Sequence, residues 1–395
     1  MSTHRVIDAD GHVLEPVDLW ERYIDSAYRG RAPKIIEDET GLQRVVVDGR
    51  LFPRHHYGLN GAGSAGAPVV PPAIKTKRYE FNKAGGFDSR ERLKDMDLEG
   101  IDVAVLFPTL GMFLTGIQDR PLSERISIAY NNWLHDYCSV DTDRLKGYAH
   151  LPLLDVQASI RELRRAVTEL GMVGVYMRPN PYGHRNLDDA EYDPLWEAIV
   201  DLDVCVGFHE GANGPLPIIG ADRYEANAKG RYNHYISHVL SHPFEQQFAC
   251  LTLIAGGVFE RFPDLRVAFM ESGVGWLPYW VDRMDKDFEH LGWYVPDLQL
   301  KPSEYFQRNC WVSCDPDEVM LNYVAATMGD DNLLFASDYP HFDAMFPGAV
   351  AAIANRTELS ASSKEKILGL NAERLLKLSS RQPAERDALL SGARA

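Results

Sequence analysis

The sequence lacks paired cysteines, long apolar runs and an excess of positive charge. Its five cysteines form no Cys-x-x-Cys pair, which argues against a disulfide framework and a zinc knuckle. No apolar run reaches the roughly 18 residues that a membrane span requires. The formal net charge is −16, and nucleic acids and anionic membranes repel such a chain. Together with the absence of a secretion signal, these features predict a cytoplasmic protein without nucleic-acid or membrane partners.

What the sequence does contain is a repeated alternation of strand and helix signals. Its 395 residues are 45% hydrophobic, which is enough to bury a large core in one domain. Short apolar runs recur, each followed by a segment of helical period. The predicted strands are Val6–Ala9, Val103–Phe107, Leu145–Leu151, Val173–Met177, Cys205–Phe208, Arg266–Met270, Cys310–Ser313 and Leu333–Ala336. Such β-then-α units predict an α/β protein with a (β/α)₈ TIM barrel rather than an open doubly wound sheet.

A region rich in glycine and proline interrupts this rhythm after the first strand. It extends from about residue 30 to residue 86 and contains a β-like patch, Gln43–Phe52. We expect an insertion that covers the mouth of the barrel. A single barrel domain is predicted over residues 1–378, and residues 379–395 form a polar C-terminal tail.

Acidic and histidine residues stand at the ends of the first and fifth predicted strands. TIM barrels place their chemistry at the C-terminal ends of the strands. Asp10 and His12 follow the first strand, and residues two apart face the same side of a strand. Asp8 could share that face or support His12 from behind. His209 ends the fifth strand. The alternatives are a polar turn for the first group and a hydrogen-bonded core histidine for His209.

The sixth and eighth strands end in the same way. Glu271 follows a run that should be buried, and an unpaired buried carboxylate is costly. Asp338 closes the eighth strand, with Pro340 and then His341 after it, so that Asp338 and His341 could converge from a turn. Helix capping is the alternative for both carboxylates. Taken together, these strand ends predict a metal site, because converging carboxylates require a cation.

Two further candidates come from other parts of the chain. His242 precedes Pro243, and a helix is predicted over Phe244–Phe262 with the proline in its first turn. His242 is a candidate ligand of a second metal ion, with a structural role as the alternative; for His238 a structural role is favoured. Arg178 follows the fourth strand, and its planar guanidinium suits a substrate anion. A salt bridge inside the barrel is the alternative for Arg178.

These residues resemble the pattern of the amidohydrolase-related family, in the branch that contains metal-dependent decarboxylases. In that family a His-x-His or Glu-x-His pair, a histidine on the fifth strand and an aspartate on the eighth hold the metal. The matching residues here are Asp10, His12, His209 and Asp338. The stretch Gly257–Leu265 also resembles the family sequence. The resemblance covers nearly the whole chain apart from the insertion. It implies a metal-dependent TIM-barrel enzyme with a small-molecule substrate, associated as a homo-oligomer or with a related chain.

Two departures from the family pattern shape the functional hypothesis. Asp10 stands where relatives often have histidine, and Glu271 stands where decarboxylases carry a histidine that acts in proton transfer. The candidate set is therefore rich in oxygen ligands, which suits two divalent ions, iron or manganese, better than a lone zinc. This version of the pattern also resembles a group of non-heme dinuclear iron monooxygenases on the same fold.

We therefore expect an enzyme that uses O₂ to hydroxylate an unactivated C–H bond of a small carboxylic-acid-type or CoA-linked substrate. Glu271 and Asp338 are its predicted catalytic residues. The first alternative is hydrolysis by a metal-activated water or non-oxidative decarboxylation, with Asp338 as both ligand and general base. The second alternative is a non-catalytic subunit of a hetero-oligomer.

Overall fold

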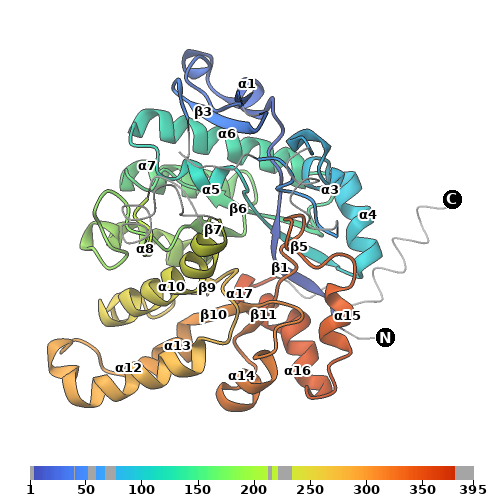
Figure 1. Ribbon diagram of the computed structural model, residues 1–395. Helices are drawn as coiled ribbons and strands as arrows, with labels where there is room; N and C mark the ends of the chain where they lie inside the picture. The colour runs from blue at the N-terminus through green and yellow to red at the C-terminus, as the bar shows by residue number, and fades with distance from the viewer. Residues whose placement is uncertain are drawn as a thin grey trace.

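The computed structural model describes residues 4–39, 41–51, 59–66, 77–211, 216–220 and 234–378. Eight parallel strands form one sheet that curves into a barrel, with helices around its outside (Figure 1). In sheet order the strands are β1 Ile7–His12, β5 Val103–Phe107, β6 Leu145–His150, β7 Gly174–Met177, β8 Cys205–Phe208, β9 Val267–Phe269, β10 Cys310–Cys314 and β11 Leu333–Phe335. Each predicted strand corresponds to one of these eight, so the predicted TIM barrel is confirmed.

Three of the helices around the barrel begin at a capping aspartate. The side chains of Asp88, Asp119 and Asp155 accept backbone N–H groups in the first turns of α4, α6 and α7, which satisfies donors that the helix itself leaves unpaired. The helices around the barrel are α4 Ser89–Glu99, α5 Gly111–Leu114, α6 Arg120–Cys138, α7 Val156–Thr168, α8 Asp193–Asp201, α10 His234–Ala255, α11 Val258–Arg261, α12 Leu277–Leu291, α13 Pro302–Asn309, α14 Leu321–Met328, α15 Ala349–Ala354, α16 Ala361–Glu365 and α17 Asn371–Leu376.

Strand side chains alternate between two hydrophobic cores. In β5, Val103, Val105 and Phe107 belong to the core inside the barrel. Ala104 and Leu106 belong to the core between the strands and the surrounding helices. This alternation follows from the two-residue period of a strand. It also means that every second residue at the C-terminal end of a strand faces the barrel axis, where the candidate site lies.

The segment between β1 and β5 carries a small antiparallel sheet. Its strands are β2 Lys34–Glu37, β3 Gln43–Val47 and β4 Arg50–Leu51, accompanied by the helices α1 Leu19–Tyr23 and α3 Ala84–Phe87. Helix α1 packs against α6, and the small sheet lies on that side of the barrel (Figure 1). Farther along, the backbone N–H of Ala65 donates to the carbonyl oxygen of Pro340, so this segment also contacts the loop after β11.

Helix α10 differs from its prediction. It begins at His234, ten residues before the predicted start, and Pro243 lies inside it rather than in its first turn. A proline inside a helix removes one backbone hydrogen bond and is unfavourable by itself. Here the helix nevertheless continues through Pro243, and it places His238 and His242 one turn apart on the same face.

The predicted C-terminal tail, residues 379–395, lies outside the described residues. Within the described part of the chain, every helix is too short or too polar to cross a lipid bilayer.

Candidate metal centre

The first group of candidate ligands lies at the C-terminal ends of β1 and β8. Asp10, His12 and His209 are all fully buried. The Nε2 atoms of His12 and His209 are 3.0 Å apart. Asp10 Oδ1 lies 3.5 Å from the Nε2 of His12 and 3.4 Å from the Nε2 of His209. Asp338 joins them from the end of β11, with Oδ1 3.2 Å from the Nε2 of His12. Four residues from three distant parts of the chain thus converge.

The hydrogen bonds of the two imidazole rings determine which nitrogens face this point. The Nδ1 of His12 lies 2.9 Å from the carbonyl oxygen of Pro108. The Nδ1 of His209 lies 2.9 Å from the carbonyl oxygen of Glu210. Because a carbonyl oxygen only accepts hydrogen bonds, each Nδ1 carries a hydrogen. In neutral rings, both Nε2 atoms therefore present lone pairs to each other. Lone pairs at this distance repel, so a proton or a cation must lie between them.

The carboxylate of Asp10 lacks hydrogen bonds within the described part of the chain. Both of its carboxylate oxygens are buried, and neither has a hydrogen-bond partner among the described residues. Burial by itself raises the pKa of Asp10, but the imidazoles of His209 and His12 lower it below its ordinary value, so the group is ionised. A buried carboxylate without hydrogen bonds costs several kcal/mol unless a cation compensates it. The donor set, two imidazole nitrogens and two carboxylates, fits a divalent metal ion.

Glu271 lies between this group of candidate ligands and a second group, formed by His238 and His242 of α10. Its Oε2 lies 3.3 Å from the Nε2 of His209. Its Oε1 lies 3.3 Å from the Nε2 of His242 and 3.5 Å from the Nε2 of His238. The His238 and His242 rings stack with their centroids 4.1 Å apart. Burial alone raises the pKa of Glu271, but the three histidines lower it well below its ordinary value. One carboxylate therefore faces two separate clusters of histidine nitrogens.

Asp338 also pairs with His341. The Nδ1 of His341 lies 2.9 Å from Asp338 Oδ1, and its Nε2 lies 2.9 Å from the Thr109 hydroxyl. That hydroxyl donates its hydrogen to the carbonyl oxygen of Val13 at 2.7 Å, so the Nε2 of His341 is the donor to Thr109. The Nδ1 of a neutral His341 would present a lone pair to a carboxylate. A hydrogen bond across this 2.9 Å contact would require one additional proton on the pair.

Two of the carboxylates sit on strained backbone. Glu271 has φ 47° and Asp338 has φ 55°, in the left-handed region where residues other than glycine are uncommon. Such a conformation costs about 1–3 kcal/mol and persists only where the surroundings hold it. The backbone N–H of Asp338 donates to the carbonyl oxygen of Asp10 at 2.9 Å. The backbone N–H of Glu271 donates to the Ser313 hydroxyl at 3.0 Å. The strain turns both carboxylates toward the same cavity.

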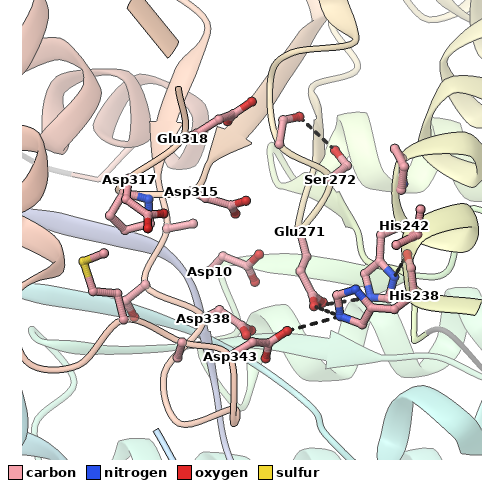
Figure 2. Close-up of a pocket in the computed structure, with 18 residues that line it drawn as sticks. Asp10, His238, His242, Glu271, Ser272, Asp315, Asp317, Glu318, Asp338 and Asp343 are labelled. Carbon is pink, nitrogen blue, oxygen red and sulfur yellow. Dashed lines mark hydrogen bonds and ion pairs between the residues drawn. The ribbon is translucent and has the colours of Figure 1, made fainter. Parts of the chain in front are cut away.

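A cavity of about 610 Å³ opens over these residues. Figure 2 shows Glu271 between Asp10 and the two histidines of α10, with Asp315, Asp317 and Glu318 on the other side. Among the lining residues that the structure describes, none is lysine or arginine. The acidic ones are Asp10, Glu271, Asp315, Asp317, Glu318, Asp338 and Asp343. Carboxylates gathered in this way repel one another, so a bound cation lowers the energy of the cavity.

Comparison with known families assigns the chain. A family model described as amidohydrolase matches residues 7–378. The chain belongs to the amidohydrolase family. The resemblance expected from the strand-end residues is thereby confirmed for the family.

The curated relatives of this amidohydrolase include decarboxylases. The 2-amino-3-carboxymuconate-6-semialdehyde decarboxylase of Dictyostelium discoideum is 30% identical over 300 residues, covering 74% of this chain and 77% of the relative. The gamma-resorcylate decarboxylase of Polaromonas sp. is 26% identical over 348 residues, covering 84% of this chain and 99% of the relative.

Solved structures share the fold. An amidohydrolase from Mycobacterium avium subsp. paratuberculosis superposes with a TM-score of 0.78 at 23% identity, covering 96% of this chain and 99% of that chain. A dihydroxybenzoic acid decarboxylase from Polaromonas sp., with bound manganese and the inhibitor 2-nitroresorcinol, gives a TM-score of 0.64 at 22% identity, covering 96% and 98%.

The prediction of an O₂-dependent monooxygenase is wrong. The two curated relatives named above are decarboxylases, and a non-oxidative decarboxylation releases CO₂ without consuming O₂. The findings support the decarboxylase alternative instead, and they give no support to iron. The error came from Glu271, whose replacement of a histidine was interpreted as a change of reaction. The expected association into oligomers stays a prediction.

The structure does not bring Arg178 into the described cavity. The residue is fully buried at the end of β7 and forms an ion pair with Glu210. This is the salt bridge inside the barrel that the sequence left as the alternative to a substrate contact. Glu210 is also the residue whose carbonyl oxygen accepts the Nδ1–H of His209, so the ion pair lies directly behind a candidate ligand.

Sequence reasoning missed four acidic residues of the amidohydrolase cavity, Asp315, Asp317, Glu318 and Asp343. Asp315 directly follows β10, and the strand-end rule would have found it at the seventh strand. Burial, together with the nearby charge of Glu318, raises the pKa of Asp315 to about 7. Asp343 has its Oδ2 3.2 Å from the Nε2 of His238. No pattern marks Asp343, because its position depends on the path of the loop after β11.

Proposed function

We propose that this amidohydrolase is a metal-dependent, non-oxidative decarboxylase of a small organic carboxylate. The observation that carries the proposal is the environment of Asp10, an ionised and buried carboxylate without hydrogen bonds beside two imidazoles whose Nε2 atoms face each other. The two decarboxylase relatives supply the reaction class. The cavity adds support, since Asp10, Glu271 and Asp338 line it and a substrate can reach them there.

Asp10, His12, His209 and Asp338 would hold the first ion. Carboxylate and imidazole ligands suit manganese, and manganese is bound in the decarboxylase structure from Polaromonas sp.. When bound, a divalent ion supplies charge that polarises the carboxylate of the substrate. The carbonyl oxygens of Pro108 and Glu210 keep the two imidazoles in the tautomer that binding requires.

The chain's own contribution to the reaction is a proton. In a decarboxylation the C–C bond to the carboxylate breaks, CO₂ leaves, and its electron pair stays on the substrate carbon, which must gain one proton. Asp338 lines the cavity, and its Oδ1 lies 2.9 Å from the Nδ1 of His341. The pair can therefore pass this proton to the carbon from Asp338. Thr109 accepts from the Nε2 of His341 and keeps the ring in place.

The deciding experiment measures CO₂ under nitrogen. Manganese-loaded protein is incubated with a panel of hydroxylated benzoates and unsaturated carboxylates, in H₂O and in D₂O. We expect one CO₂ for each substrate consumed, the same rate in nitrogen as in air, and one deuterium on the product carbon. Cleavage of esters or lactones without CO₂ release would instead establish hydrolysis, and a rate that requires air would contradict the proposal.

We further infer that the cavity binds a second cation at Glu271. The Nδ1 of His242 lies 3.2 Å from both the carbonyl oxygen of His238 and the Ser241 hydroxyl, and its Nε2 faces the Glu271 carboxylate at 3.3 Å. Glu271 and His242 would hold this cation. Burial alone lowers the pKa of His238, but Asp343 and Glu271 raise it to about 10, so His238 competes for this position with its own charge.

Metal analysis of His242→Ala tests the second ion. Wild-type protein reconstituted with manganese should contain two equivalents, and His242→Ala should contain one, because the first group does not involve His242. Gln247→Ala, on the same helix, is the matched control and should retain two. A single equivalent in the wild type would refute the second site and leave the first unaffected.

A further inference from the structure

The first and last strands of the barrel meet at a seam. In sheet order β1 and β11 are the two ends. Two backbone hydrogen bonds join them, from the N–H of Asp338 to the carbonyl oxygen of Asp10 at 2.9 Å and from the N–H of His12 to the carbonyl oxygen of Tyr339 at 2.7 Å. The seam therefore runs through the residues proposed to hold the first metal ion. Any widening of the seam would separate Asp338 from Asp10 and His12.

Arg92, from helix α4, reaches this seam from outside the barrel. Its side chain is 2% exposed. Its Nη1 donates to the carbonyl oxygen of His12 at 2.8 Å and to that of Tyr339 at 3.3 Å. The guanidinium also lies 4.5 Å from the centroid of the Tyr339 ring. One planar cation thus contacts both sides of the seam.

Asp8 connects the same two strands on the side where Arg92 lies. Its Oδ1 accepts the backbone N–H of Ser337 at 2.9 Å, and its Oδ2 accepts the Ser337 hydroxyl at 2.6 Å. Ser337 directly precedes Asp338. The Nη2 of Arg92 lies 3.9 Å from Asp8 Oδ2, so the two buried charges offset each other.

Gly11 makes the approach of Arg92 possible. The register of β1 against β5 shifts between Asp8 and Gly11. A Cβ atom at Gly11 would lie 2.4 Å from the Nη2 of Arg92, a distance that would displace the guanidinium. Gly11, which lies between Asp10 and His12, therefore has no side chain at the point where β1 passes Arg92.

We propose that Arg92 and Asp8 are positioning residues that hold the seam closed and thereby set the separation between Asp338 and the Asp10–His12 pair. The inference rests on the proposed metal centre. Neither residue lines the described cavity, so both act through the backbone and through Ser337. Groups that orient metal ligands in this way typically contribute about 10- to 100-fold to metal affinity or activity.

The test is a manganese titration of metal-free Arg92→Lys. Lysine keeps the charge but lacks the planar fork that spans two carbonyl oxygens. We expect manganese affinity to fall about 10- to 100-fold, with a lower kcat at saturating metal and a changed manganese electron paramagnetic resonance spectrum. Loss of fold stability alone would leave the affinity and the spectrum of the folded fraction unchanged.

Arg144→Lys is the matched control. Arg144 likewise donates to two backbone carbonyl oxygens, of Ile101 at 2.9 Å and of Asp102 at 3.1 Å, and to one aspartate, Asp97 at 2.8 Å. These contacts lie at the N-terminal end of β5, away from the candidate centre. Its replacement should lower the melting temperature and leave manganese affinity as in the wild type.

Ser337→Ala is a milder second variant, which removes the hydroxyl that donates to Asp8 and accepts the backbone N–H of Tyr339. It should weaken manganese binding in the same direction by a few-fold. If the wild type binds manganese and both Arg92→Lys and Ser337→Ala bind it equally well, the positioning role is refuted while the metal centre stands. If the wild type itself does not bind manganese, the proposed function fails and this inference fails with it.

Discussion

Replacing Asp338 with asparagine should lower the kcat of decarboxylation by on the order of 10²- to 10⁴-fold even at saturating manganese. This is the range that a positioned proton donor or acceptor contributes. Asp338 Oδ1 lies 2.9 Å from the Nδ1 of His341, and an amide in place of the carboxylate cannot take a proton from the imidazole and pass it on. The measurement is single-turnover CO₂ release at saturating metal.

Asparagine is the appropriate replacement because of the backbone. Asp338 has φ 55°, and asparagine tolerates this left-handed conformation about as well as aspartate does, whereas alanine would be strained there. The amide oxygen can also still face a cation. The substitution therefore removes the charge and the ability to carry a proton with little change of shape.

Asp331→Asn provides the control at the other end of the same strand. Asp331 lies just before β11 and pairs with Lys366 at 2.7 Å, a surface contact worth little. Its replacement should leave kcat unchanged. A kcat within about threefold of the wild type for Asp338→Asn would contradict the assigned role and move the proton source to another group.

The barrel and the ends of its strands could be predicted from sequence because both rest on local regularities. Eight apolar runs of strand length mark the strands, and the two-residue period of a strand fixes which neighbours share a face. That rule alone grouped Asp10 with His12. A second rule drew attention to His209, Glu271 and Asp338, because a charged or imidazole side chain that ends a buried strand requires a partner.

Helix α10 shows where local rules failed. Pro243 indicated a helix start, because proline is favoured in the first turn and unfavourable farther along. In the structure the helix continues through it and carries His238 and His242 toward Glu271. Contacts with a distant strand determine this arrangement, and a single sequence contains no local trace of them.

The reaction could not be inferred from the ligands either. Carboxylates and imidazoles around a cation serve oxygenation, hydrolysis and decarboxylation alike, because each of these reactions uses the ion to bind and polarise oxygen atoms. The distinguishing step is the proton delivered to carbon, and the Asp338–His341–Thr109 contacts that would store it become visible only once β5 and β11 are placed together.

The second large effect is expected for Asp10→Asn. This substitution should lower manganese affinity more than about 100-fold, because the loss of a charged ligand costs more affinity than the loss of a residue that only contacts a ligand. Turnover at micromolar manganese should disappear, as it should in wild-type protein after chelation. Added manganese should restore the chelated wild type but not the variant. The rise in melting temperature that manganese causes in the wild type, through binding to the folded state only, should vanish too.

The metal-free state of this variant makes the test specific. The amide that Asp10→Asn introduces can donate to one of the facing Nε2 lone pairs of His12 and His209, which are 3.0 Å apart, so the metal-free melting temperature should change by only a few degrees. Suppose instead that Asp10 serves only as the counter-charge of a protonated histidine. The substitution would then break a buried pair and destabilise the fold by about 3–5 kcal/mol, while manganese affinity would stay within a few-fold. Asp203→Asn, which removes a carboxylate bound by Arg266 at 2.8 Å, shows how far stability can fall with no change in manganese affinity.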